Sequence, residues 1–394
     1  MSIDDAIIQN LISFDDPDGV LSFYTGFTPA QAADPQPTSQ IEIRNQIKAI
    51  RAEFADIDDR DRERAVNERL DAVAPEVERL LDPRASGRGR ALFVGVRSGR
   101  TESVAVQIPF ADRVIYNDSA YVRPLVAALD EGRPAGILVV SRSSARRLAW
   151  SLGEATEEAD YTFDLPDQVL ADEKSGPSPS NPQHPYQGHV NRDKFEDRVA
   201  KHLRRDIRHV VEDTLAQVTK GGWDRLVVSA PPKLRDTVAE LIGDVAGVRV
   251  LLAEQAWEDF STAQIAEHAF ELLRSVHRDR ERALVREATE RTLAGGAGAL
   301  GLRAVCDALN EGRVAHLLYD DTMVLEGYVA EDGAVHPRSE GGEAVAEMNL
   351  SPEPFFIERL VVKTITTSGL VTPVDEPAAD DLAGHDGIGA LLRW

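Results

Sequence analysis

Two histidines, a tyrosine and a glutamine stand close together in the stretch HPYQGH, at the end of a segment rich in proline and serine. Their imidazole, phenol and amide groups can stack on a nucleobase or form hydrogen bonds to it without a fixed charge. Four prolines stand between Ser175 and Tyr186, so we expect an irregular loop over 171–191. The loop residues that we expect to make contacts are His184, Pro185, Tyr186, Gln187, Gly188 and His189.

The loop leads directly into an amphipathic helix that is basic although the chain is acidic. Apolar residues recur at three- and four-residue steps from Phe195 to Val218 and predict a buried stripe. Basic residues recur at the same spacing and form a second stripe that could contact phosphates. The stripe consists of Lys194, Arg198, Lys201, Arg205 and Arg208. The residues that we expect to bind RNA are Arg192, Lys194, Arg198, Lys201 and Arg205.

Each of these two features has a plainer explanation. The basic stripe could be a solvated face held by ion pairs along the helix, with Asp193 and Asp197 beside Lys194 and Arg198. The loop could be a flexible linker, which its composition would suit. However, it lies between a strand and a helix of one expected domain, where long loops commonly carry function.

Composition limits the classes of protein that this chain can represent. The 394 residues are 42 % hydrophobic and carry a formal net charge of −23, which is typical of a globular protein with two or three domains. This charge argues against a generally nucleic-acid-binding surface, so we expect no DNA partner, and any contact with RNA must be local. The acidic start of the chain is not a secretory signal and no window approaches 18 apolar residues. With a single cysteine, Cys306, these features predict cytoplasmic localisation and no membrane contact.

No motif predicts a metal, a cofactor or a catalytic constellation. His184 and His189 lack the cysteine or paired carboxylates that would complete a zinc site. The glycine-rich stretch AGGAGALG (294–301) lacks the Lys-Ser/Thr of a P-loop and follows a helix, so we expect a flexible turn between two helices. Cys306 falls within an apolar helical run and is expected to be a buried core thiol. We therefore expect no metal, no cofactor and no catalytic residue on the evidence of motifs.

The order of elements predicts an α/β protein of three domains built as mixed-sheet sandwiches. Residues 1–133 would form a mixed domain with a strand at 19–27, a long helix at 41–81 and a β-hairpin near 89–107. Residues 134–258 alternate strand, helix and strand and contain the loop. Residues 259–394 would begin with a long helix at 262–292 and continue through a helix and several strands, one of them at 355–365.

Two stretches of the third domain resemble a known family. GAGALGLRAVCDALNEGRVAHLLYDD and the ending DGIGALLRW resemble the last domain of archaeal and eukaryotic peptide-chain release factors and of Pelota. The resemblance implies an L7Ae-like fold for residues 259–394 and a helix start in the closing segment. It also implies a release-factor-like middle domain at 134–258 with a protruding loop, and it fits the bacterial branch of the superfamily, which includes the Balon-like ribosome factors.

The resemblance implies a ribosome-associated translation factor that binds rRNA in the A site, with a translational GTPase as a further partner. Hydrolytic members carry Gly-Gly-Gln in the loop, whereas this chain has Pro185, Tyr186 and Gln187. Because two glycines permit backbone torsions that tyrosine does not readily adopt, we favour a non-hydrolytic hibernation or ribosome-protection factor. Two alternatives remain open: a peptidyl-tRNA hydrolase in ribosome rescue that uses Gln187, and a ribosome-independent, stress-related interaction protein.

Overall fold

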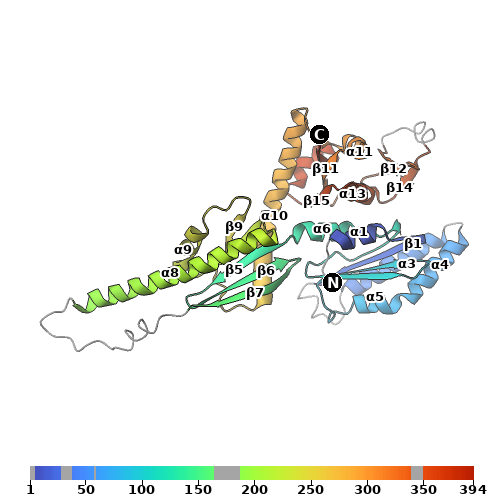
Figure 1. Ribbon diagram of the computed structural model, residues 1–394. Coiled ribbons are helices and arrows are strands. Elements are labelled where there is room, and N and C mark those ends of the chain that lie inside the picture. The colour runs from blue at the N-terminus through green and yellow to red at the C-terminus, as the bar shows by residue number, and fades with distance from the viewer. Residues whose placement is uncertain (1–4, 28–37, 57–58, 164–186, 339–348) are drawn as a thin grey trace. The chain divides into compact units, whose positions relative to one another are not determined.

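The computed structural model describes residues 5–27, 38–56, 59–163, 187–338 and 349–394, and for 187–198 it describes the backbone without the side chains. The chain divides into two compact units, here called unit 1 (1–132 with 275–394) and unit 2 (133–274) (Figure 1). Helices and strands alternate along the described residues, and the strands form four β-sheets, so the predicted α/β class is confirmed. None of the helices in these ranges is long and apolar enough to cross a membrane.

The N-terminal part of unit 1 is an antiparallel sheet covered by helices on one face. Its strand order is β3-β2-β1-β4, with β1 at Asp15–Gly26, β2 at Gly89–Gly95, β3 at Thr101–Val106 and β4 at Arg113–Ser119. The predicted strand and hairpin are therefore confirmed, whereas β4 was not foreseen. After the short helix α1 (Asp5–Ile12), helices α3 (Thr38–Ala55), α4 (Arg60–Ala72) and α5 (Ala74–Leu80) pack their apolar residues on the sheet.

The prediction of one continuous helix over 41–81 is wrong, because local signals divide it. Asp59 accepts a hydrogen bond from the backbone N–H of Arg62 at 3.0 Å and so caps the start of α4. Pro75 stands in the first turn of α5, where its missing N–H costs no helical hydrogen bond. The apolar spacing continues across both breaks, which is why periodicity alone could not locate them.

Unit 2 is a three-layer sandwich around a mixed sheet. The strand order is β7-β6-β5-β8-β9, with β5 at Ala135–Val140, β6 at Ser144–Ser151, β7 at Glu154–Thr162, β8 at Arg225–Ser229 and β9 at Arg249–Leu252. The β5–β8 and β8–β9 pairs are parallel and the others antiparallel. Helices α8 (Gln187–Gly221) and α9 (Pro232–Ile242) cover one face, and the first half of α10 (Thr262–Leu293) covers the other.

The C-terminal part of unit 1 contains a second mixed sheet in the order β10-β16-β11-β15. Its elements are β10 (Gly298–Leu300), α11 (Leu302–Asn310), β11 (Val314–Asp320), α13 (Phe356–Thr366), β15 (Leu370–Val374), the 3-10 turn Ala379–His385 and β16 (Ile388–Leu392). A small sheet is formed by β12 (Gly327–Val329), β13 (Val335–Pro337) and β14 (Ser351–Glu353). Helix α6 (Arg123–Glu131) precedes the boundary with unit 2.

Three expectations for this part are wrong. The stretch 294–301 is not only a turn between helices, because Gly298–Leu300 form strand β10. The apolar run at 355–365 forms helix α13 instead of a strand, because a short apolar run is compatible with either when it is buried. The closing segment forms the central strand β16 instead of starting a helix. In β16, Leu391 pairs with His316 of β11, and both Leu391 and Leu392 are buried. Cys306 is buried in α11, as predicted.

The division into three domains stays a prediction. Its first boundary, after residue 133, lies one residue from the boundary of unit 2. Residues 259–274, which were expected to open the third domain, belong to unit 2 because the first half of α10 contributes Ile265, Ala269 and Leu273 to the core there. The L7Ae-like assignment of the last part likewise stays a prediction.

Candidate functional site

Helix α8 carries the predicted basic stripe and is anchored through its C-terminal half. It has 35 residues, which corresponds to about 52 Å at 1.5 Å per residue. Figure 1 shows it continuing past the edge of the unit 2 sheet. The predicted apolar stripe is confirmed from Leu203 onward: Ile207, Val210, Val211 and Val218 are buried, and Leu203 packs against them.

An ion pair fixes one arginine of α8 to the neighbouring helix. The Arg204 guanidinium donates hydrogen bonds of 2.7 and 3.2 Å to the two carboxylate oxygens of Glu240 in α9. These bonds lower the pKa of Glu240 and raise that of Arg204. Arg204 therefore holds α8 in place, and the plainer interpretation as an ion-paired face applies to this residue.

A second polar anchor fixes the helix to the sheet. The Asp213 carboxylate of α8 accepts hydrogen bonds from the hydroxyl of Tyr161 in β7 and from the guanidinium of Arg147 in β6. The bond from Tyr161, followed by that from Arg147, holds the pKa of Asp213 below its ordinary value. Burial, together with the same bond, raises the pKa of Tyr161 to about 12. Both anchors fix the rotation of α8 about its own axis and hence the direction of its other faces.

The face of α8 turned away from the core is basic. Lys201, Arg205 and Arg208 are exposed, and at 3.6 residues per turn their positions fall within about 60° of one another. Ile207 and Val210 lie on the opposite side of the helix, in the core. The Arg205 side chain is 70 % exposed, and its Nε lies 3.6 Å from Asp206 Oδ1, which is too far for a hydrogen bond. We call Lys201, Arg205 and Arg208 the basic face.

The other predicted site residues are only partly described. His184, Pro185 and Tyr186 lie outside the described residues, as do the side chains of Gln187, His189, Arg192, Lys194 and Arg198. Helix α8 begins at Gln187, so residues 187–191, which were expected in the loop, are helical. No proline follows Pro185 in this stretch, so nothing there removes a backbone donor that the helix needs. The contacts proposed for these side chains therefore stay predictions.

The described ranges contain no group of three or more His, Cys, Asp or Glu side chains that could hold a metal ion.

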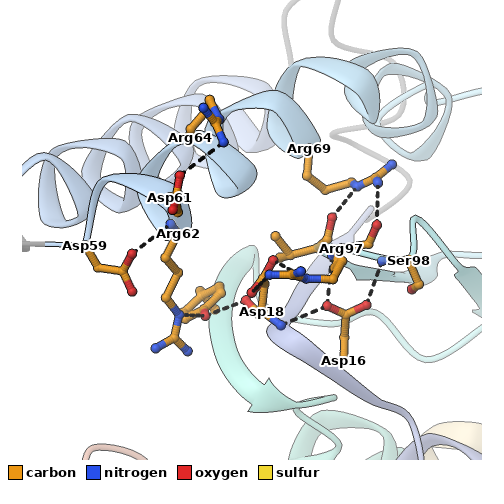
Figure 2. A network of polar contacts seen from close by, with 11 residues as sticks. Asp16, Asp18, Asp59, Asp61, Arg62, Arg64, Arg69, Arg97 and Ser98 are labelled. Carbon is orange, nitrogen blue, oxygen red and sulfur yellow. Dashed lines mark hydrogen bonds and ion pairs between the residues drawn. The ribbon is translucent and has the colours of Figure 1, made fainter.

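The described ranges contain a polar network in the N-terminal part of unit 1 that was not among the predicted sites (Figure 2). The Asp16 carboxylate accepts the backbone N–H groups of Arg97 at 2.8 Å and of Ser98 at 2.9 Å, in the turn between β2 and β3. Burial opposes ionisation of Asp16, but these bonds outweigh it and lower its pKa. The carboxylate thus fixes the turn.

Arginines of the same network link this turn to helix α4. Arg69 donates to the carbonyl oxygens of Val96 at 2.9 Å and of Arg97 at 3.4 Å. The Arg97 guanidinium in turn donates two bonds of 2.8 Å to Asp18. Because the Arg97 guanidinium is bound to a carboxylate, we interpret the network as a support for the hairpin. The sequence offered only two separate signals for it, the aspartates at 15–18 and the arginine-rich turn at 97–100, and no local spacing connects them.

A comparison with protein families gives one match. Residues 121–274 match the family described as "Bacterial archaeo-eukaryotic release factor family 10". The matched segment runs from just before α6 to the middle of α10 and includes the proline-rich loop and α8. The predicted relationship to the bacterial branch of the release factor superfamily is confirmed by this match. No curated protein matches the sequence.

Solved structures with similar folds come from archaea and yeast. A "Model of ribosome-bound archaeal Pelota and ABCE1" aligns over 100 % of this chain and 95 % of that one, with 12 % identity and a TM-score of 0.42. Pelota of Archaeoglobus fulgidus aligns over 77 % and 79 %, with 15 % identity and a TM-score of 0.36. Dom34 of S. cerevisiae, described as "a translation termination-like factor", aligns over 78 % and 80 %, with 11 % identity and a TM-score of 0.35. At these scores the similarity supports no conclusion about activity.

Proposed function

We propose that this chain, whose residues 121–274 match the bacterial archaeo-eukaryotic release factor family 10, is a ribosome-binding translation factor that occupies the A site. The observation that carries the proposal is the basic face of α8. Lys201, Arg205 and Arg208 are exposed on one side of the helix, while Arg204 is bound to Glu240 and helps to set their direction. Exposed cations in a row at helical spacing suit the phosphates of rRNA.

The acidic net charge of the chain makes RNA binding depend on this basic face. A chain with a formal charge of −23 is repelled by RNA over most of its surface, so binding depends on the places where the sign reverses. Each Lys or Arg that neutralises a phosphate releases counterions, which makes affinity depend on salt. A local basic face on an acidic protein therefore favours one orientation on the ribosome.

The finer assignment is a hibernation or ribosome-protection role without hydrolysis. Hydrolytic members of the superfamily present Gly-Gly-Gln, and here Tyr186 precedes Gln187. Rings and prolines can fill an RNA cavity, since stacking on a base contributes about 1–3 kcal/mol. Rescue by peptidyl-tRNA hydrolysis through Gln187 is the competing role, and a translational GTPase stays the proposed further partner.

Co-sedimentation with 70S ribosomes tests the proposal. The full chain should pellet with ribosomes at moderate salt, and the triple reversal Lys201→Glu, Arg205→Glu and Arg208→Glu should remain in the supernatant. The matched control reverses three exposed basic residues of unit 2 away from this face, Arg142→Glu, Lys220→Glu and Lys233→Glu, with the same change in net charge. An equal loss of ribosome pelleting in both variants would mean that binding depends on net charge in general and not on the basic face. No pelleting of the unmodified chain would favour a ribosome-independent interaction protein.

A further inference from the structure

The chain passes between the two units at two places of very different stiffness. The first crossing follows Gly132, directly after α6, and the chain enters β5 at Ala135. The second follows Arg274, in the interior of α10, which is continuous from Thr262 to Leu293. Since a continuous helix keeps its backbone hydrogen bonds across the boundary, the second crossing is stiff, and the first is the one that can move.

Both halves of α10 are held in cores. Ile265 and Ala269 lie in the core of unit 2 beneath the sheet. Val285 and Ala288 lie in a core of unit 1 with Leu318 of β11. Helix α10 is thus anchored in the core of each unit. An element that binds α10 near residue 275 binds it at the boundary between the units.

Four charged or titratable residues of unit 1 meet at this point, and we call them the hinge clamp: Asp130 of α6, and His277, Arg280 and Glu281 of α10. Arg280 donates a hydrogen bond of 2.8 Å to Asp130 Oδ1. His277 Nε2 lies 3.0 Å from Glu281 Oε1 and 3.9 Å from Asp130 Oδ2. The side chains of Asp130, His277 and Glu281 are 10 %, 8 % and 4 % exposed and are largely withdrawn from water, whereas that of Arg280 is 29 % exposed.

Partial burial makes these interactions costly to break. Asp130 Oδ2 is buried without a hydrogen-bond partner in the described part of the chain, so the carboxylate relies on Arg280 and on the nearby imidazole. The Asp130–Arg280 pair is partly buried, so removing one member leaves a charge that water solvates poorly, which costs more than the loss of an exposed pair. Glu281 reaches a further element, because its Oε2 lies 3.4 Å from the backbone N–H of Asp375, just after β15.

The chain is also anchored on the far side of Gly132. Within unit 2, Arg133 forms an ion pair with Asp224, and the guanidinium of Arg225 donates to the carbonyl oxygen of Arg133. The first crossing is therefore held by Asp130 on one side of Gly132 and by Arg133 on the other.

We propose that the hinge clamp is a conformational device that limits the movement of unit 2 relative to unit 1. With Asp130 bound to Arg280, α6 is fixed to α10, so both crossings move as one. With the clamp open, the C-terminal end of α6 is no longer bound to α10, so the first crossing can move independently of the second. The inference goes beyond the proposed function, because it requires no ribosome.

Hydrogen exchange of the full chain tests the clamp itself. Asp130→Asn and Arg280→Ala should raise the exchange rates of α6 amides about 10- to 100-fold, the factor for losing one hydrogen bond to a charged group. Arg282→Ala is the matched control, since Arg282 lies on the same helix and pairs with Asp279 within it. Peptides from β5 and β8 should keep their protection, which shows that the variants are folded. Should Arg280→Ala fail to fold, Arg280→Lys should also raise the exchange rates of the α6 amides, but to a smaller extent.

The distance between the units tests the consequence. Spin labels at Lys48→Cys in unit 1 and Asp244→Cys in unit 2, both at exposed positions, report the distribution of that distance. The distribution should broaden in Asp130→Asn and Arg280→Ala and stay as in the unmodified chain in Arg282→Ala. Unchanged α6 exchange in Arg280→Ala would overturn the clamp. Faster exchange with an unchanged distance distribution would overturn its role in limiting the movement of unit 2.

Discussion

The hydroxyl of Tyr161 in β7 and the carboxylate of Asp213 in α8 are joined by a hydrogen bond that ties the long helix to the edge of the unit 2 sheet. Asp213 also binds the buried guanidinium of Arg147. We predict that Asp213→Ala lowers the free energy of unfolding by about 1 kcal/mol, because Asp213 is 48 % exposed and water screens part of the interaction. Urea unfolding measures this change.

The neighbouring Glu212 supplies the control for that measurement. It is exposed on the same turn, so Glu212→Ala should leave the unfolding free energy within about 0.5 kcal/mol of the unmodified chain. Equal effects of the two substitutions would show that Asp213 does not anchor α8.

Glu358 of α13 predicts a pH dependence of stability in unit 1. Its buried carboxylate accepts the backbone N–H groups of Val122 at 2.6 Å and Arg123 at 3.1 Å, at the start of α6. Burial outweighs these bonds and raises the pKa of Glu358 from 4.5 to about 7. The folded state then binds the proton more tightly than the unfolded state, so this contribution to stability is full below pH 4.5 and falls as pH rises to about 7.

Unfolding of Glu358→Gln at several pH values checks the direction of this change in stability with pH. Between about pH 4.5 and pH 7, the stability of the unmodified chain should fall relative to Glu358→Gln by on the order of 3 kcal/mol, at 1.36 kcal/mol for each pKa unit. Glu326→Gln, at an exposed position, should follow the unmodified chain. Parallel curves for Glu358→Gln and the unmodified chain would mean that Glu358 has an ordinary pKa.

The burial of Leu391 predicts how much free energy of unfolding is lost when the C-terminal sheet is disturbed. Leu391 lies in β16, in a core with Val285 of α10 and Leu318 of β11. Leu391→Ala should lower the free energy of unfolding by roughly 2–4 kcal/mol, through lost apolar contact and the cavity that remains. Val324→Ala removes an apolar side chain that is 83 % exposed and should have little effect. A small effect at Leu391 would place the closing segment outside the folded core.

Local patterns predicted those elements whose residues carry their own signals. The hairpin of β2 and β3, the strand–helix–strand order of unit 2 and the apolar stripe of α8 all follow from periodicity and turn residues. Helix α13 and strand β16 did not, because each is a short apolar run whose type is decided by its neighbours in space. The structure describes the side chains of the basic stripe only from Lys201 onward, and the loop lies largely outside the described residues, so the loop contacts stay predictions.

Polar partners from distant parts of the chain could not be predicted. Asp130 and Arg280 belong to helices far apart in the sequence, and Glu358 caps a helix that begins at Arg123. In the sequence each is one charged residue among many, and 28 % of the chain is charged. Their burial and pairing arise from the packing of whole elements, which no local spacing encodes.

The absence of Gly-Gly-Gln predicts an absence of peptide release. Catalysis needs the glutamine within hydrogen-bond reach of the ester, and an error of about 1 Å can cost ~100-fold in rate. We expect the unmodified chain and Gln187→Ala to release no peptide above background from stalled peptidyl-tRNA complexes in a single turnover. Release by the unmodified chain that Gln187→Ala abolishes would instead support the hydrolase.

The salt dependence of ribosome affinity tests the central claim most directly, because it counts the phosphate contacts made by the basic face. The slope of log affinity against log salt for the unmodified chain should be steeper by about 2–3 units than that of the variant Lys201→Glu, Arg205→Glu and Arg208→Glu. The control Arg142→Glu, Lys220→Glu and Lys233→Glu should keep the steep slope. Identical slopes and affinities for all three proteins would contradict the account and leave the basic face of α8 as a solvated surface.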